Sequence, residues 1–206
     1  MAPGRAQPEA EDLAVALASI GLIQFGQFAQ ANGEAWPVAV HLRWLPSYPA
    51  LLRQVAGELA PRARAAGADR MLTTREAIPL GTAVSLASDV PMVYPFGQEA
   101  DHTAAFVIEG AYDVGHPTLL LSDVLLGAEQ AQVITRLARR VGLEITLVLA
   151  LLDLDRGARE ELARAGFAVQ AALTLSEMLP VLEREGWLPP GMRAVVESWM
   201  AGQERG

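Results

Sequence analysis

The order of apolar and polar residues along the chain predicts strands and helices that alternate from residue 70 onward. The expected strands cover residues 70–74, 91–94, 104–109, 118–123, 143–152 and 167–173. The expected helices cover residues 79–87, 128–141 and 159–165, and another begins at the capping box Thr174-Leu-Ser-Glu177. This alternation predicts an α/β fold built on a doubly wound, mostly parallel sheet. The apolar run 143–152 suits a strand that is covered on both faces.

The two ends of the chain follow other patterns. Residues 9–20 have helical spacing, and two strands, 24–30 and 36–42, flank the turn signal Asn32-Gly33. A helix over 47–66 then leads into the alternating part, and an amphipathic helix is expected within 188–206. The sequence therefore predicts an N-terminal helix-and-hairpin lobe (1–46), an α/β core (47–186) and a C-terminal helical extension (187–206).

Composition narrows the classes of function. The 206 residues carry a net charge of −8, which argues against binding to nucleic acid. All 16 basic residues are arginine, so no mechanism that needs lysine is available. Cysteine is absent, which excludes disulfides and thiolate metal sites. No apolar run reaches the roughly 20 residues that span a bilayer, and no signal peptide is recognisable, so we expect no membrane contact and a cytoplasmic protein.

Six segments, in this order and spacing, resemble the orotate phosphoribosyltransferase family. They are Ile20 to Phe28 (IGLIQFGQF), Ser47-Tyr-Pro49, Ala77 to Ser85 (AIPLGTAVS), Pro91 to Tyr94 (PMVY), Ile108 to Tyr112 (IEGAY) and Ala172 to Met178 (ALTLSEM). The resemblance covers about residues 10–185. It implies a type I phosphoribosyltransferase fold in which the N-terminal lobe forms a small hood. It also implies a homodimer, magnesium, and transfer of ribose 5-phosphate from phosphoribosyl pyrophosphate to orotate.

The phosphoribosyl-pyrophosphate loop departs from the family pattern. The family has two adjacent acids followed by Thr-Thr-Gly-Gly, whose amides hold a phosphate at a helix N-terminus. Here Ser122-Asp123 stands for the acid pair and Leu126-Gly-Ala-Glu129 for the rest, so that Asp123 and a displaced Gly127 remain. Glu129 falls in the first helical turn, where its charge satisfies the helix dipole and repels a phosphate.

The cations of the family's other loops are also replaced. The catalytic loop, Arg-Lys-x-x-Lys-x-His-Gly in the family, corresponds to residues 95–103, in which only His102 matches. His102 and Asp123 are therefore the residual catalytic candidates, although a solvated loop histidine is the simpler interpretation of His102. The hood lysine corresponds to Ala31, and the arginine that contacts the orotate carboxylate corresponds to Leu154. Arg156 lies two residues further on and would point the same way if the strand continued.

Several residues keep anion or metal binding open. Thr73, Thr74 and Arg75 stand in the pyrophosphate loop, where Arg75 either binds an anion or pairs with Glu76 at the surface. Together with Ser122, Asp123, Gly127 and Arg156 they form the set of candidate ligand-binding residues. His41, His102 and His116 lack metal-ligand spacing. Asp153 and Asp155 suggest a magnesium pair, but a solvated loop is the simpler interpretation. We therefore predict no protein-held metal.

Three functions fit these observations. The first is a non-catalytic binding or regulatory homologue, whose pocket Phe96, Leu125, Leu126 and Leu154 would make less polar. The second is a divergent, active phosphoribosyltransferase that uses Arg75, Asp123 and His102 with magnesium. The third is an interaction subunit that pairs with a genuine transferase through the inherited dimer surface, with residues 188–206 as added contact. The physiological ligand is not identified by the sequence.

Overall fold

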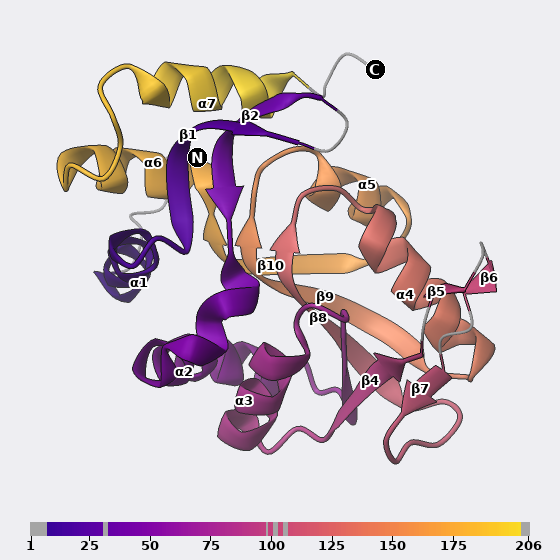
Figure 1. Cartoon of the computed structure of the whole chain (residues 1–206). Coiled ribbons are helices and arrows are strands. Elements are labelled where there is room, and N and C mark those ends of the chain that lie inside the picture. The colour runs from indigo at the N-terminus through magenta and orange to yellow at the C-terminus, as the bar shows by residue number, and fades with distance from the viewer. Residues whose placement is uncertain (1–7, 31–32, 98, 101–102, 105–106, 203–206) are drawn as a thin grey trace.

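A computed structural model describes residues 8–30, 33–97, 99–100, 103–104 and 107–202 of the chain (Figure 1). Its centre is a six-stranded sheet in the order β10-β9-β8-β3-β4-β7. These strands are β3 (Arg70–Thr73), β4 (Met92–Phe96), β7 (Val107–Glu109), β8 (Pro117–Leu125), β9 (Glu144–Asp153) and β10 (Ala168–Thr174). All neighbours are parallel except β4 and β7, which are antiparallel. The α/β fold with a mostly parallel sheet, predicted from the alternation, is confirmed.

Helices cover both faces of this sheet, as Figure 1 shows. On one face lie α1 (Pro8–Ser19), α2 (Pro49–Ala65), α3 (Ile78–Ser88) and α6 (Leu175–Arg184). On the other face lie α4 (Glu129–Arg140) and α5 (Ala158–Arg164). Adjacent residues of one strand enter different cores: Leu119 and Leu121 pack on the first face, and Leu120 on the second. This alternation is the period-2 geometry of a strand buried on both sides.

Within the hood, β1 (Ile23–Ala29) and β2 (Ala35–Val40) form a separate two-stranded antiparallel sheet. It lies above the carboxyl ends of the central strands (Figure 1). The strand expected over 36–42 ends at Val40, because a 3₁₀ helix, η1 (Leu42–Ser47), turns the chain into α2. The Asn32 half of the expected hairpin turn lies outside the described residues.

The C-terminal extension contains α7 (Met192–Ala201), which begins four residues later than the start of the predicted segment. Pro189 and Pro190 precede it, and Gly191 adopts a positive φ at its N-cap. Helix α7 contacts β2 and α6, and Val196 on its inner side is fully buried. Hood, core and extension therefore share one hydrophobic cluster.

Two further expectations were only partly right. The strand expected over 104–109 is shorter, because β7 spans Val107–Glu109, and β6 (Thr103–Ala104) pairs instead with β5 (Glu99–Ala100). The capping box at α6 forms, with Thr174 Oγ1 accepting the N–H of Glu177 at 3.3 Å. The Glu177 carboxylate, however, accepts the Thr174 hydroxyl proton at 2.9 Å rather than a backbone N–H. Among the described residues no helix is both long and apolar enough to cross a bilayer.

Candidate functional site

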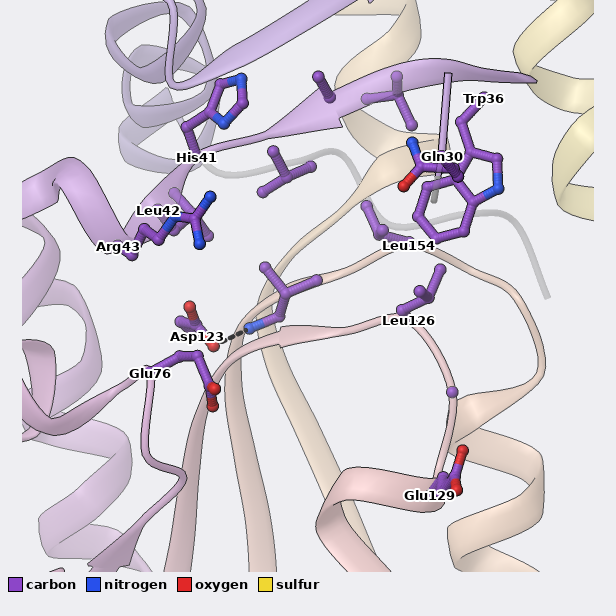
Figure 2. A pocket seen from close by; sticks show the side chains of 15 residues that line it. Gln30, Trp36, His41, Leu42, Arg43, Glu76, Asp123, Leu126, Glu129 and Leu154 are labelled. Atoms are coloured by element: carbon purple, nitrogen blue, oxygen red, sulfur yellow. Dashed lines mark hydrogen bonds between the residues drawn. The ribbon is translucent and has the colours of Figure 1, made fainter. Parts of the chain in front are cut away.

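A cavity of about 660 Å³ lies between the hood and the carboxyl edge of the central sheet (Figure 2). Ligands of doubly wound sheets bind at this edge. The core side of the cavity is formed by the loop after β3, the end of β8 with the turn that follows it, and the end of β9. The hood side is formed by β2 and the start of η1. The lining residues are Gln30, Trp36, Val38, Ala39, Val40, His41, Leu42, Arg43, Glu76, Asp123, Val124, Leu126, Gly127, Glu129 and Leu154.

The floor of the cavity is shaped by local hydrogen bonds at the end of β8. Asp123 Oδ1 accepts the N–H of Val124 at 2.9 Å, and the Ser122 hydroxyl donates to the carbonyl of Val124 at 2.9 Å. Side chains that bond nearby backbone groups in this way hold a strand end in one conformation. The Ser122 hydroxyl is therefore buried and already hydrogen-bonded to the backbone, whereas Asp123 faces the cavity.

Three carboxylates give the floor its charge: Glu76, Asp123 and Glu129. Burial is the main cause that raises the pKa of Asp123, and the negative charge of Glu76 raises it further, while backbone hydrogen bonds to the carboxylate act in the opposite direction. Glu129 is the first residue of α4, so it lies in the first helical turn, as predicted from the sequence. Figure 2 shows Glu76 and Asp123 together on one side and Glu129 on the other.

The roof of the cavity comes from the hood. Trp36, Val38 and Val40 of β2 are apolar lining residues. Figure 2 shows Leu126 and Leu154 of the core next to Trp36. His41 and Arg43 also line the cavity, and the His41 ring stacks on Trp44 at 4.2 Å with an interplanar angle of 12°.

Of the sequence-predicted ligand-binding residues, Asp123 and Gly127 line the cavity. Thr73 and Thr74 are fully buried at the end of β3, and their hydroxyls have no hydrogen-bond partner among the described residues. Arg75 follows them and is not part of the lining. The remaining catalytic candidate, His102, lies outside the described residues.

Arg156 turns away from the cavity. Its guanidinium carbon lies 4.0 Å from the ring centroid of Trp199 in α7, and Arg156 is not a lining residue. The chain leaves the strand direction after Asp153, since Asp155 has a φ of +53°. Arg156 was expected to point like the family arginine only if the strand continued. The strand does not continue, so this expectation is not met.

The pair Asp153 and Asp155 is structural. Asp153 is 1% exposed, so its description as part of a solvated loop was wrong. One of its oxygens accepts the Arg159 Nε–H at 3.2 Å, and the other accepts the N–H of Asp155 at 3.0 Å. The Asp155 carboxylate accepts the N–H of Ser176 in the first turn of α6 at 2.8 Å. Both side chains thus fasten the β9–α5 loop instead of opening toward a ligand.

The described residues contain no group of three or more histidine, aspartate or glutamate side chains that could hold a metal ion. Glu76 and Asp123 are two neighbouring carboxylates. Such a pair is sufficient for magnesium only if phosphate oxygens and water complete the coordination. Any magnesium here would therefore arrive with a phosphate-bearing ligand.

Sequence reasoning found little of the hood half of the site. It did not single out Gln30 or Arg43, and it considered His41 only as a possible metal ligand, a role that its spacing argues against. It also placed Phe96 and Leu125 in the pocket, whereas Phe96 is 62% exposed in β4 and Leu125 is buried in the core. The lining positions of Leu126 and Leu154 agree with the expectation. A sequence signal for Arg43 was not available, since the docking of the hood brings it to the cavity.

No family model matches the sequence. Among curated proteins, the uridine 5′-monophosphate synthase of Bos taurus is 29% identical over 176 residues, which are 84% of this chain and 37% of that protein. The orotate phosphoribosyltransferase of Natronomonas pharaonis is 27% identical over 172 residues, which are 82% of this chain and 96% of that protein.

The solved structures give the same relationship. The UMP synthase of Leishmania donovani superposes with a TM-score of 0.83 and 29% sequence identity, covering 94% of this chain and 42% of that one. The chain thus spans less than half of these synthases and nearly the whole length of the Natronomonas pharaonis protein.

Proposed function

The chain is a homologue of the orotate phosphoribosyltransferases with the type I phosphoribosyltransferase fold, and from that premise we propose that it is a non-catalytic binding or regulatory member of that group. In this proposal the cavity under the hood has the location of the substrate site of the transferases but binds a different ligand. The ligand is less anionic than phosphoribosyl pyrophosphate or orotate.

The observation that carries the proposal is the charge of the cavity lining. The described lining contains three acidic residues, Glu76, Asp123 and Glu129, which face the cavity from the core. It contains one arginine, Arg43. Like charges close together in a partly desolvated site repel, and a dianionic phosphate would add to that repulsion. A pocket for a pyrophosphate ester and a pyrimidine carboxylate needs more positive than negative charge in its lining.

The N-terminus of α4 supports the same conclusion. A free helix N-terminus attracts phosphate through its unpaired N–H groups and its dipole. Here Glu129 stands in the first turn and supplies a negative charge from the protein itself. A phosphate at this position would have to displace or approach that carboxylate.

The other walls favour an apolar contact with the ligand. Trp36, Val38, Leu126 and Leu154 line the cavity, and the family arginine is replaced by Leu154. Apolar and aromatic walls with a few polar groups are typical of small-molecule sites. A flat or apolar body therefore suits this side, and hydrogen-bond donors suit the carboxylates opposite.

A divergent transferase remains the second candidate, because of the pair Glu76 and Asp123. Two neighbouring carboxylates can share a magnesium ion whose other ligands are phosphate oxygens. In that case Asp123 would hold magnesium phosphoribosyl pyrophosphate in spite of the charge of the floor. A homodimer in the cytoplasm is part of either proposal, and light scattering after gel filtration tests the dimer.

Titration calorimetry of phosphoribosyl pyrophosphate with magnesium decides between the two candidates. We expect no binding heat at ligand concentrations of about 1 mM, a range that detects free energies as weak as about −4 kcal/mol. Micromolar binding that Asp123→Ala abolishes, with orotate-dependent release of pyrophosphate, would overturn the non-catalytic proposal. The orotate phosphoribosyltransferase of Natronomonas pharaonis, assayed in parallel, is the positive control.

A further inference from the structure

We propose that Trp199 of α7 and Arg156 of the β9–α5 loop are positioning residues for the cavity, because they clamp Trp36 in the hood. The C-terminal helix would then be a working part of the ligand site. The importance of this clamp for a ligand rests on the proposed function, whereas the clamp itself can be tested on the free protein.

The three side chains form a stack. The Arg156 guanidinium lies over the Trp199 ring at 4.0 Å, and the Trp199 and Trp36 rings lie 5.5 Å apart at an interplanar angle of 55°. A guanidinium over an indole is attracted by the ring quadrupole, and a tilted pair at this distance is a favoured aromatic geometry. The stack joins three segments that are far apart in the sequence.

Charge and burial strengthen the connection to the hood. The Nε and Nη1 atoms of Arg156 are shielded from solvent and have no hydrogen-bond partner among the described residues. Burial lowers the pKa of Arg156, and the negative charge of Glu34 raises it in opposition. Glu34 also accepts the Trp36 Nε1–H at 3.3 Å, so this carboxylate is bonded to one end of the stack while its charge acts on the arginine at the other end. The Trp199 ring is therefore the contact on which the position of the arginine depends in the described part of the chain.

The hood needs such a fastening. In the part of the chain that the structure describes, strands β1 and β2 pair with each other and with no strand of the central sheet. An isolated two-stranded sheet has marginal stability in water, and its position depends on side-chain packing. Ile23 and Val38 anchor the end of the hood that adjoins the core. Trp36 and its pairing partner Phe28 lie toward the other end, where α7 packs on β2.

The consequence for the cavity follows from Trp36. Its side chain lines the cavity, and the lining residues Val38 and Val40 follow it on the same strand. If Trp36 is released from Trp199, the apolar roof moves relative to Leu126 and Leu154. The clamp therefore sets the height and the shape of the apolar side of the site.

Hydrogen exchange of the full chain without ligand tests the clamp. In Trp199→Ala we expect exchange at Phe28 and Trp36 to accelerate about tenfold, which corresponds to about 1.4 kcal/mol of local opening. Exchange in β8 should stay as in the wild type. Trp199→Phe keeps a ring and should restore most of the protection. Arg156→Met should accelerate exchange at the same two positions to a smaller extent.

Trp187→Ala is the matched control, because Trp187 is a 43% exposed tryptophan in the turn before α7 and takes no part in the stack. Unchanged exchange at Phe28 and Trp36 in Trp199→Ala would overturn the proposal. So would an equal acceleration in the hood and in β8, because that result means general destabilisation. Neither result depends on whether phosphoribosyl pyrophosphate binds, so the clamp and the proposed function can fail separately.

Discussion

Gly81 in α3 lies directly against Thr73 at the end of β3, so closely that a β-carbon at position 81 would overlap the Thr73 Cγ2 methyl and approach Met92 Sδ to 2.9 Å. The first turn of α3 can therefore pack on the sheet only because residue 81 has no side chain. This contact fixes the loop between β3 and α3, which carries Glu76 into the cavity.

Gly81→Ala should destabilise the fold by about 1–3 kcal/mol, the usual cost of overpacking a well-filled core. The measurement is chemical denaturation. Thr73→Ser removes the overlapping methyl and should recover part of the loss in the double variant. Gly57→Ala is the control, since a β-carbon there meets nothing within 4 Å and alanine favours the helix by up to about 1 kcal/mol. A neutral Gly81→Ala would contradict the packing argument.

Asp155 should be more sensitive to alanine than to asparagine. Its left-handed backbone, φ +53°, and its bond to the N–H of Ser176 both suit a short polar side chain. Asp155→Ala loses the hydrogen bond to the first turn of α6 and strains the left-handed backbone. We expect the free energy of unfolding, measured by thermal or chemical denaturation, to fall by about 1–2 kcal/mol. Asp155→Asn keeps an acceptor and the backbone preference. Equal losses in both variants would show that the carboxylate charge, rather than the geometry, matters.

Asp123→Asn should stabilise the protein at pH 7. Burial raises the pKa of Asp123 above its ordinary value of 3.8. At pH values between 3.8 and the raised pKa, the folded state therefore binds more protons than the unfolded state. Stability consequently falls as the pH rises through the window from 3.8 to the raised pKa, and the cost persists at neutral pH. Asparagine removes that cost and can still accept the Val124 N–H.

The check is the difference in unfolding temperature between Asp123→Asn and the wild type, measured from pH 7 down to about pH 4. A gain of 1 kcal/mol corresponds to about 2–4 °C for a chain of this size. The gain should shrink as the pH falls, because the wild-type carboxyl then becomes protonated. Glu109→Gln, at an exposed carboxylate in β7, should show no such gain. A variant that is less stable at pH 7 would refute the desolvation argument.

Glu129→Gln should improve binding of inorganic pyrophosphate. A carboxylate in the first turn of a helix contributes about 0.3–1 kcal/mol of electrostatic interaction, so its removal should tighten anion binding by roughly two- to fivefold. Competition or calorimetric titration measures the change. Glu144→Gln is the control, since Glu144 begins β9 at the opposite edge of the sheet. Equal effects of both variants would mean that net charge alone governs the affinity.

Parts of the fold could be predicted because short-range patterns encode them. The apolar run over 143–152 became β9, in which seven consecutive residues are buried. The antiparallel pair expected on either side of Gly33 forms as β1 and β2, and Gly33 itself has a positive φ. The glycines at 21, 67 and 142 follow α1, α2 and α4 with positive φ. The 3₁₀ helix after Val40 was missed, because six residues with Pro46 among them are too few to show a helical period.

The candidate site was predictable only on one side. Asp123, Gly127, Leu126 and Glu129 belong to one continuous segment, so a motif could indicate that they lie together. Arg43 and Trp36 belong to the hood, and nothing in their own neighbourhood states which part of the core they face. Arg156 was expected near the nucleobase side, but the left-handed turn at Asp155 sends it to Trp199.

The sequence by itself determined the alternation of strands and helices, the two buried faces of the sheet and the loss of cations at the family's loops. These properties depend on residue type and on spacing over a few positions, which set local backbone preference and burial. Only the tertiary structure decided that the C-terminal helix packs on the hood, that Asp153 is buried with Arg159, and that a carboxylate floor faces an apolar roof. Those relationships depend on how whole elements dock, and docking is fixed by the summed packing of many side chains rather than by a local pattern.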